Sequence, residues 1–320
     1  MTWLTWRQHR GEALVVGAAL ALLAAVLIWV GRDIYATYQQ LGVGTCLVHP
    51  DNPNCSDVIE SFRRQYSAWE YAIPWLNFVP AALAMLIGAP LVARELEHHT
   101  QRLIWTQSVT RARWIAVKLA AVLGAGVLVA GILIALFTWW RWPFDQLDGR
   151  FSPTGFDFEG TVLLGYVAFA LALAIAAGTL VRRAIPAMVV TLAGFLAVRL
   201  PIEFVLRPIY QQAITVTMNP GQPSSAIAPE DWIVASGWVD ALGHHISDDQ
   251  AFSTCLPNTG LEITKRAYLQ CIQSHGWHEY ISFQPANRFW TFQAVETGIY
   301  LALVVGLLAL TIWWVRRRIA

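Results

Sequence analysis

Charge is scarce in this sequence, and lysine is almost missing from it. Only 13% of the 320 residues are Asp, Glu, Lys or Arg, whereas about a quarter of an average soluble domain is charged. Lys118 and Lys265 are the only lysines, and neither follows a glycine-rich turn, so the sequence lacks the phosphate-binding motif G-x-x-x-x-G-K-S/T. If ATP hydrolysis drives this protein, another polypeptide must carry it out.

Other catalytic and binding signatures are also missing. There is no G-x-S-x-G elbow of a serine hydrolase and no basic tract interleaved with aromatics that would indicate nucleic-acid binding. No nucleophile and base lie at a matching depth in the apolar segments, which disfavours an intramembrane enzyme. Some imidazoles and carboxylates could ligate a metal, but they form two groups far apart in the sequence without a Cys-x-x-Cys pair, so we expect no metal site. These residues are His244, His245, Asp248, Asp249, His275 and His278.

Apolar and aromatic residues dominate instead. The chain is 56% hydrophobic and contains 16 tryptophans. Six apolar runs are long enough to cross about 30 Å of hydrocarbon as helices that rise ~1.5 Å per residue. We therefore predict an all-α polytopic membrane protein with six transmembrane helices. The runs are residues 13–30, 71–93, 115–140, 161–181, 184–206 and 291–315.

Three details refine these spans. Residues 1–12 resemble an interfacial anchor, and the alternative for the run that follows, a cleaved signal peptide, is disfavoured because no A-x-A-like cleavage site follows the run. Pro80 and Pro90 predict kinks in the second run. The fourth run is rich in Ala and Gly, which predicts close approach of neighbouring helices.

Basic residues gather in four of the segments between or beside the runs. Residues 1–12, 94–118, 181–183 and 316–320 hold 12 of the 22 Lys and Arg residues in 45 positions, whereas the other polar segments hold 9 in 151 positions. Short arginine-rich segments stay in the cytoplasm. We therefore predict a multi-pass plasma membrane protein with both termini in the cytoplasm, a polar connection outside at residues 31–70, and a short acidic loop at 141–159.

All four cysteines fall in segments predicted to lie outside, where oxidising conditions allow disulfides. Four cysteines permit three pairings. We favour the two local pairs, Cys46 with Cys55 and Cys255 with Cys271. Bridges between the two segments are the main alternative.

The longest polar segment, residues 207–290, is too long to be a simple turn. It predicts a mixed extracellular cap, with a strand at residues 232–239 and a helix at 261–274. The cap divides the chain into residues 1–206, which hold the interfacial segment and the first five helices, and residues 291–320, which hold the sixth helix and the basic C-terminus.

A few ionisable residues lie inside the predicted spans. Arg199 and Glu203 are one helical turn apart and can pair, and Glu296 lies near the start of the sixth helix. Such residues are expensive in a membrane and are candidates for a translocation path or a gate. The alternative is a buried structural pair with a carboxylate at the membrane interface.

The segment 94–118 is the only long segment between two apolar spans that is dense in positive charge. Its charges alternate with apolar residues, which is typical of an amphipathic helix that a soluble partner could bind. The alternative is a loop that lies on lipid headgroups. The residues that we assign to this loop are Arg94, Glu95, Glu97, Thr100, Arg102, Leu103, Ile104, Trp105, Arg111 and Lys118.

This segment resembles the stretch between the second and third helices of ABC-2-type ABC transporter permeases. In that family R-E-x-E-x-G-T precedes an apolar run, a P-x-S-R-like turn and a Lys that opens the next helix. The matching residues are Arg94, Glu95, Glu97, Thr100, Arg111 and Lys118. His99 stands where the family usually has Gly, and residues 108–110 replace the proline-containing turn. Residues 284–296 and the basic end of the chain resemble actinobacterial members of the same group.

The resemblance implies one half of a permease. Two six-helix subunits would pair, with a homodimer expected, and each would dock one cytoplasmic ATP-binding subunit that holds ATP and Mg. Residues 94–118 would contain the coupling helix, with Leu103, Ile104 and Trp105 buried in the ATPase and with charged neighbours that orient it. No cofactor is then expected in this chain, and membrane lipid is its other partner.

We therefore expect the permease subunit of an ATP-driven exporter that moves a hydrophobic or amphipathic compound outward. Few charges lie in the aromatic-rich spans, which favours an apolar substrate over an ion. Nothing resembles a docking loop for a binding protein, which disfavours import. The alternative is a membrane sensor or accessory protein whose cap binds a ligand and which has no ATPase partner.

Overall fold

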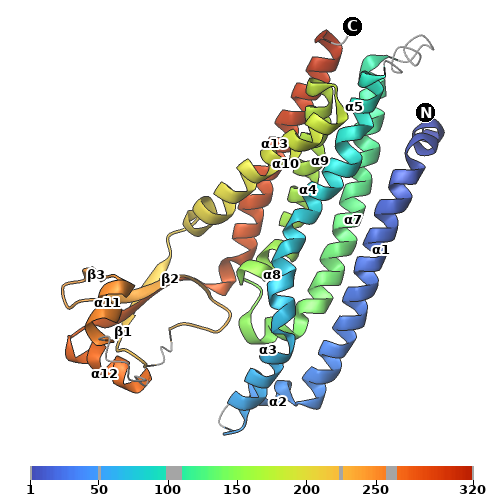
Figure 1. The fold of residues 1–320 in the computed structure, drawn as a ribbon. Coiled ribbons are helices and arrows are strands. Elements are labelled where there is room, and N and C mark those ends of the chain that lie inside the picture. The colour runs from blue at the N-terminus through green and yellow to red at the C-terminus, as the bar shows by residue number, and fades with distance from the viewer. Residues whose placement is uncertain (1, 50–51, 99–109, 223–225, 257–264, 319–320) are drawn as a thin grey trace.

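The computed structural model describes residues 2–49, 52–98, 110–222, 226–256 and 265–318. Within these residues, six helical segments are long and apolar enough to cross a membrane, as the sequence predicts. Both chain ends lie at the same end of the resulting bundle (Figure 1). The spans are Leu14–Gln40, Cys55–Glu97, Ile115–Asp148, Val162–Val181, Ala184–Ile209 and Ala286–Arg317.

Helix α9 (Val162–Val181) lies at the centre of the bundle and is buried along most of its length. A Cβ on Gly178 would lie only 2.8 Å from the backbone oxygen of Ala89, so glycine permits the helices to approach closely there. The packing predicted from the small residues of the fourth run is therefore present. The helices that pack most closely on α9 are α5 (Ala89–Glu97), α7 (Arg111–Asp148), α10 (Ala184–Pro201) and α13 (Phe289–Arg318).

The second span is a series of short helical segments. Pro74, Pro80 and Pro90 each lie in the first turn of a new segment. Proline lacks the N–H that a helix interior needs, so the breaks at Pro80 and Pro90 occur where the sequence predicts kinks. The segments are α3 (Cys55–Ala72), η1 (Ile73–Phe78), α4 (Val79–Leu83), the π-helical turn η2 (Ala84–Gly88) and α5.

The end of the bundle away from the termini is more helical than the sequence predicts. Helix α1 (Thr2–Gln40) continues past residue 30 and is followed by α2 (Val43–Val48). The acidic loop expected at 141–159 is also wrong, because α7 continues to Asp148 and α8 (Pro153–Phe158) follows. Tertiary contacts stabilise the added turns. The Tyr66 hydroxyl of α3 lies 2.8 Å from the Asp33 carboxylate and 2.7 Å from the Thr37 hydroxyl of α1.

A small cap lies beside this end of the bundle (Figure 1). Its antiparallel sheet has the strand order β1-β4-β2-β3, and side chains of β2 and β3 pack against two short helices. The strand predicted at 232–239 has those limits, whereas residues 261–264 of the predicted helix lie outside the described residues. The elements are β1 (Ile214–Met218), β2 (Trp232–Val239), β3 (His245–Ile246), α11 (Asp248–Cys255), α12 (Lys265–Ser274) and β4 (His278–Gln284).

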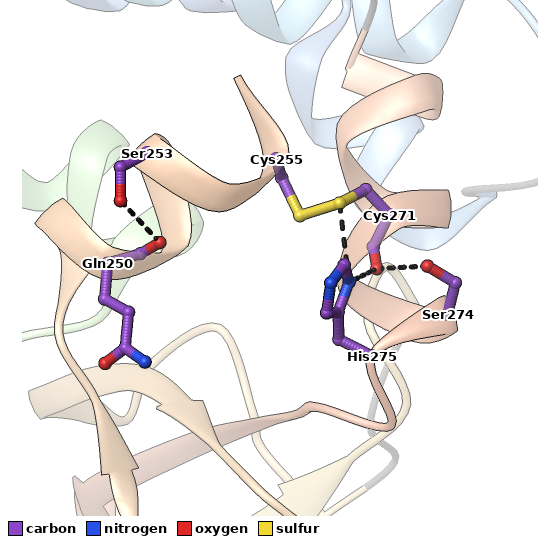
Figure 2. Close-up of a disulfide and its surroundings, with 6 residues drawn as sticks. All are labelled: Gln250, Ser253, Cys255, Cys271, Ser274 and His275. Atoms are coloured by element: carbon purple, nitrogen blue, oxygen red, sulfur yellow. Dashed lines mark hydrogen bonds between the residues drawn. A yellow bond between two sulfur atoms is a disulfide. The ribbon is translucent and has the colours of Figure 1, made fainter. Parts of the chain in front are cut away.

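Both local disulfides are present. The Cys46–Cys55 bond joins α2 to the start of α3, and the Cys255–Cys271 bond joins α11 to α12 (Figure 2). Both bonds lie away from the end of the bundle that carries the chain termini (Figure 1). The disulfides and the chain termini therefore lie at different ends of the bundle, as the charge pattern predicts.

Candidate functional site

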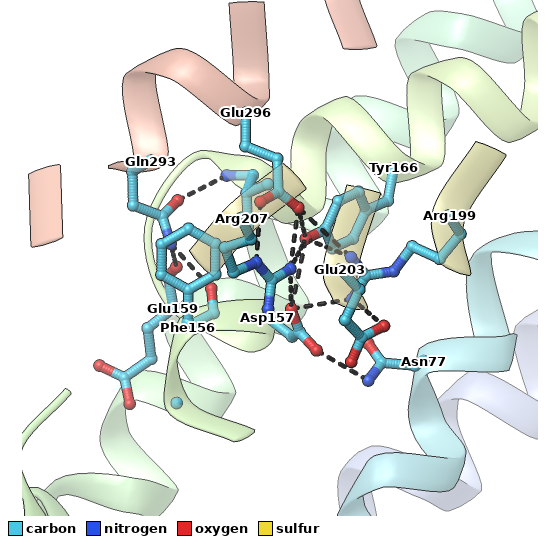
Figure 3. A network of polar contacts seen from close by, with 12 residues as sticks. Asn77, Phe156, Asp157, Glu159, Tyr166, Arg199, Glu203, Arg207, Gln293 and Glu296 are labelled. Carbon is cyan, nitrogen blue, oxygen red and sulfur yellow. Dashed lines mark hydrogen bonds and ion pairs between the residues drawn. The ribbon is translucent and has the colours of Figure 1, made fainter. Parts of the chain in front are cut away.

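Five charged or polar side chains from five elements meet at the cap-side end of the bundle (Figure 3). Asp157 comes from α8, Tyr166 from α9, Arg199 from the last turn of α10, Arg207 from η4 (Arg207–Ile209), and Glu296 from α13. Each of these residues is at most 3% exposed. We call this group the arginine–carboxylate cluster.

Glu296 is the acceptor at the centre of the cluster. Arg207 donates from Nε to Oε2 and from Nη2 to Oε1, each at 2.8 Å. The Tyr166 hydroxyl donates to Oε1 at 2.5 Å, and Nη1 of Arg199 lies 3.3 Å from the same oxygen. A buried carboxylate is tolerated when charged donors surround it in this way.

Asp157 completes the charge balance. Nη2 of Arg199 and Nη2 of Arg207 each lie 2.8 Å from its Oδ1, and Asn77 donates to Oδ2 at 2.9 Å. Burial alone raises the pKa of Asp157, but the two guanidinium groups outweigh burial and hold this pKa below its usual range. Arg199 and Arg207 thus face two carboxylates, those of Asp157 and Glu296.

The predicted pair of Arg199 and Glu203 is present, but Arg199 has closer partners. Arg199 and Glu203 lie 3.4 Å apart, but Arg199 is closer to Asp157. Sequence analysis missed the roles of Asp157, Tyr166 and Arg207. A usable signal existed for Arg207, because the four-residue spacing from Arg199 to Glu203 continues to position 207.

The cluster connects helices and is not arranged for acid–base chemistry. Its donors and acceptors face one another and are shielded from water. It joins α8, α9 and α13 to the end of the fifth span, so a path that opens between these helices must first break its ion pairs.

A second group of polar contacts fixes the turn between α7 and α8. Arg141 is 6% exposed, and its Nε lies 3.2 Å from both Asp145 Oδ1 and Glu159 Oε1. Its Nη1 donates to the Thr154 hydroxyl at 3.0 Å and its Nη2 to the Ser152 hydroxyl at 3.1 Å. One guanidinium thereby holds the acidic segment that the sequence predicts as a loop.

At the opposite end, buried contacts anchor the two sides of residues 94–118. Nζ of Lys118 lies 2.6 Å from Oε2 of Glu95, and both side chains are less than a tenth exposed. Lys118 also donates to the backbone oxygen of Leu91 at 3.1 Å. Glu97 accepts a hydrogen bond from the backbone N–H of Ala184, the first residue of α10, at 3.2 Å. Three spans therefore meet beside this segment.

The rest of the predicted loop is only partly described. Thr100, Arg102, Leu103, Ile104 and Trp105 lie outside the described residues. Arg94 lies in the last turn of α5, and Arg111 begins α7. Thr110, in the segment where the family usually has a proline-containing turn, caps α7 by accepting a hydrogen bond from the N–H of Arg113.

The histidines of the cap do not gather around one point. Within the described part of the chain, the one group of three potential metal ligands is Cys255, Cys271 and His275. The two sulfurs are bonded to each other, and Nδ1 of His275 lies 3.7 Å from Sγ of Cys271 (Figure 2). Disulfide sulfurs are not thiolate ligands, so in the oxidised protein the two cysteines form a crosslink and supply no thiolate for a metal.

Comparison with known proteins gives one match. Residues 17–207, more than half of the chain, match the model of the family described as ABC-2 membrane transporter related. A search of curated proteins and a search of solved structures each gave no match. The matched stretch reaches from the first span to Arg207 and includes the anchored segment 94–118. The chain therefore belongs to the ABC-2 membrane transporter related family and is a permease of ABC transporter type.

Proposed function

We propose that this permease couples ATP hydrolysis in a separate cytoplasmic ATP-binding subunit to the export of a hydrophobic or amphipathic compound. The observation that carries the proposal is the anchorage of residues 94–118 at the end of the bundle that holds both termini. The family supports an ATP-binding partner, since ABC-2 permeases generally work with one. ATP and Mg would be held by that partner.

The anchorage suits a loop that receives a mechanical input. The Glu95–Lys118 pair ties α5 to α7, and the hydrogen bond from Ala184 to Glu97 ties α5 to α10. A buried ion pair is costly to break once formed, so a force on the loop would move these helices together.

Helix α10 connects this input to the arginine–carboxylate cluster. It begins at Ala184, which donates to Glu97, and carries Arg199 in its last turn. A straight helix of its 18 residues spans about 27 Å, at ~1.5 Å per residue. A shift at the ATPase end would therefore move Arg199 relative to Asp157 and Glu296, which lie on other helices. The cluster would act as the outer gate.

The apolar surface of the bundle and its charge pattern support the proposed contacts with lipid and with a second copy and the proposed orientation in the membrane. Large apolar side chains of α1, α10 and α13 are exposed, for example Trp29, Ile185 and Val305. Membrane lipid and a second permease copy, with a homodimer expected, would cover these faces. The basic end with both termini would lie in the cytoplasm of a plasma membrane protein, and the disulfides would lie outside.

The test is ATPase stimulation in a complex reconstituted with an ATP-binding subunit of ABC type. The variant Glu97→Arg with Leu103→Asp reverses one anchor and charges the predicted contact surface, so stimulation should be lost. The matched control is Glu60→Arg with Leu242→Asp, at exposed residues of α3 and the cap, and it should keep stimulation. Full stimulation in the loop variant, or no stable complex with any such subunit, would overturn the proposal.

A further inference from the structure

The fifth span changes its helical geometry just before Arg207. Helix α10 ends at Pro201, and the π-helical turn η3 (Ile202–Leu206) follows it. The backbone N–H of Arg207 donates to the oxygen of Ile202, five residues back, whereas an α-helix would use the oxygen of Glu203. The turn therefore contains one residue more than an α-helical turn. Such turns are rare, and they occur mostly as single insertions, frequently at functional sites.

The surplus residue decides which way Arg207 points. Arg207 follows Arg199 by eight residues, and eight residues of α-helix end about 80° past two full turns, at about 100° per residue. Because the π turn absorbs one residue, the rotation is that of about seven residues, about 20° short of two turns. Both arginines therefore lie on nearly the same face of the span, and Nη2 of each lies 2.8 Å from Oδ1 of Asp157 (Figure 3).

The ion pairs of Arg207 fix this register. Its guanidinium donates to both carboxylate oxygens of Glu296 and is buried together with that carboxylate. On the outer side of the turn, the side chains of Phe204, Val205 and Leu206 are exposed. The buried ion pairs at the end of the turn are therefore the contacts that keep the surplus residue in place.

Two prolines confine a rearrangement to this turn. Pro201 and Pro208 lack the backbone N–H that a helix interior donates, so the ladder of hydrogen bonds is already interrupted on both sides of η3. Beyond η4, the backbone of residues 210–213 is irregular, and a rotation of the turn can end there without turning the whole cap. The hydrogen bond from Gln284 to the oxygen of Pro208, 3.3 Å long, would break in such a rotation.

We propose that η3 is the switch of the arginine–carboxylate cluster. When the ion pairs of Arg207 break, the turn rewinds as an α-helix, and the N–H of Arg207 takes the oxygen of Glu203. Arg207 then rotates by about 100° away from Asp157 and Glu296, and its Cα atom moves by about 3.5 Å around a helix of ~2.3 Å radius. The inference rests on the proposed function, because it takes the cluster to be the outer gate and names the element that opens it.

Deleting Val205 separates the switch from the cluster. The deletion removes the surplus residue at an exposed position, and Arg207 then follows Arg199 by seven residues of α-helix, so both arginines keep their face. The variant should therefore unfold at the temperature of the wild type or above it. Deletion of Val190, an exposed residue in the α-helical part of the same span, rotates the cluster residues away and should lower that temperature. The opposite order of stability would overturn the assignment of a surplus residue to η3.

The movement is measured as a distance between two spin labels on the purified full chain in lipid nanodiscs. The labels are attached to cysteines introduced at Tyr71 and Ile209, which are both exposed, since the native cysteines form disulfides. Arg207→Lys keeps the charge but loses the bidentate contact with Glu296. It should add a second distance population, shifted by about 3 Å. In combination with the deletion of Val205, it should return to the wild-type distance.

Two further variants complete the test. Glu296→Gln releases Arg207 more completely and should populate the shifted distance more than Arg207→Lys does, and the milder variant decides the result if Glu296→Gln does not fold. Deletion of Leu86, an exposed residue of the other π-helical turn η2, is the matched control and should leave the shift unchanged. An unshifted distance in the folded release variants, or a shift that persists after deletion of Val205, would overturn the switch.

None of these measurements uses the ATP-binding subunit. Loss of ATPase stimulation reports on residues 94–118, whereas the spin-label distance reports on η3 in the isolated chain. A failure of the coupling experiment and a failure of this switch are therefore distinguishable.

Discussion

Arg207 donates two hydrogen bonds of 2.8 Å to the two carboxylate oxygens of Glu296, and this pair closes the base of the cap. All four strands of the cap lie between these two residues in the sequence. The chain leaves the bundle after Arg207, forms the sheet and its helices, and returns through α13 to Glu296. A displacement of the end of the fifth span relative to the sixth helix must therefore strain or break this contact.

Glu296→Gln should be strongly destabilising. The variant leaves Asp157 as the one fully buried carboxylate beside two buried guanidinium groups, and removing one partner of a buried pair typically costs about 3–5 kcal/mol. Unfolding in detergent, followed by circular dichroism, measures the loss. Glu203→Gln is the control, because the side chain of Glu203 is 22% exposed and its ion pair with Arg199 is 3.4 Å long. An equal loss of unfolding free energy in both variants would contradict the central role of Glu296 in the cluster.

The pair beside the predicted coupling loop can be tested by a double-mutant cycle. Lys118→Met alone removes the cation 2.6 Å from the buried Glu95 carboxylate, and should lower stability by about 3–5 kcal/mol. Lys118→Met with Glu95→Leu should recover most of this loss, because no buried charge is then left behind. The double variant should still show weak ATPase stimulation, since the ionic link between α5 and α7 is gone. Additive destabilisation would show that the two side chains do not interact.

Asp157 predicts a specific acid sensitivity. Its pKa is depressed in the folded protein, while an unfolded Asp titrates near about 3.9. Its ionised form therefore stabilises the fold fully above about pH 4, and this contribution is lost as the pH falls through the folded pKa. Asp157→Asn should be less stable than the wild type at pH 7. It should also lose less stability than the wild type between pH 5 and pH 2.5, and parallel pH profiles would contradict this assignment.

The cap disulfide should stabilise the cap and leave the spans unaffected. Cys255 and Cys271 are 16 residues apart, and closing a loop of this length stabilises the folded state by about 3 kcal/mol because it restricts the unfolded chain. Cys255→Ser with Cys271→Ser should therefore speed proteolysis within the cap in intact cells. Cys46→Ser with Cys55→Ser is the matched control and should leave the rate of cap cleavage unchanged.

The spans could be predicted because their signal is local. Long apolar runs, basic connecting segments and the absence of cysteine on one side each depend on nearby sequence. The limits of the helices at the end of the bundle away from the chain termini could not be predicted in this way. Tyr66 stabilises the end of α1 from a different span, and Arg141 fixes the acidic segment from within α7.

The sequence predicted only some of the residues of the candidate site. Arg199 and Glu203 could be paired by their spacing along one helix. Asp157 lies in a segment predicted as an external loop, and its contact with Arg199 depends on how α8 folds back against the bundle. Arg207 was placed in the polar insert, although its four-residue spacing from Glu203 continues the helical pattern. Contacts between helices far apart in the sequence cannot be read from the period of either helix.

The central claim is that residues 94–118 dock on an ATP-binding subunit, and photocrosslinking in intact cells tests it most directly. A photoreactive amino acid placed at Leu103 should form an adduct with a P-loop ATPase, and the same amino acid at Leu242, which is 82% exposed in the cap, should not. An ATPase adduct at position 103 alone is the predicted result. No ATPase adduct at position 103, or an adduct at position 242, would contradict the account.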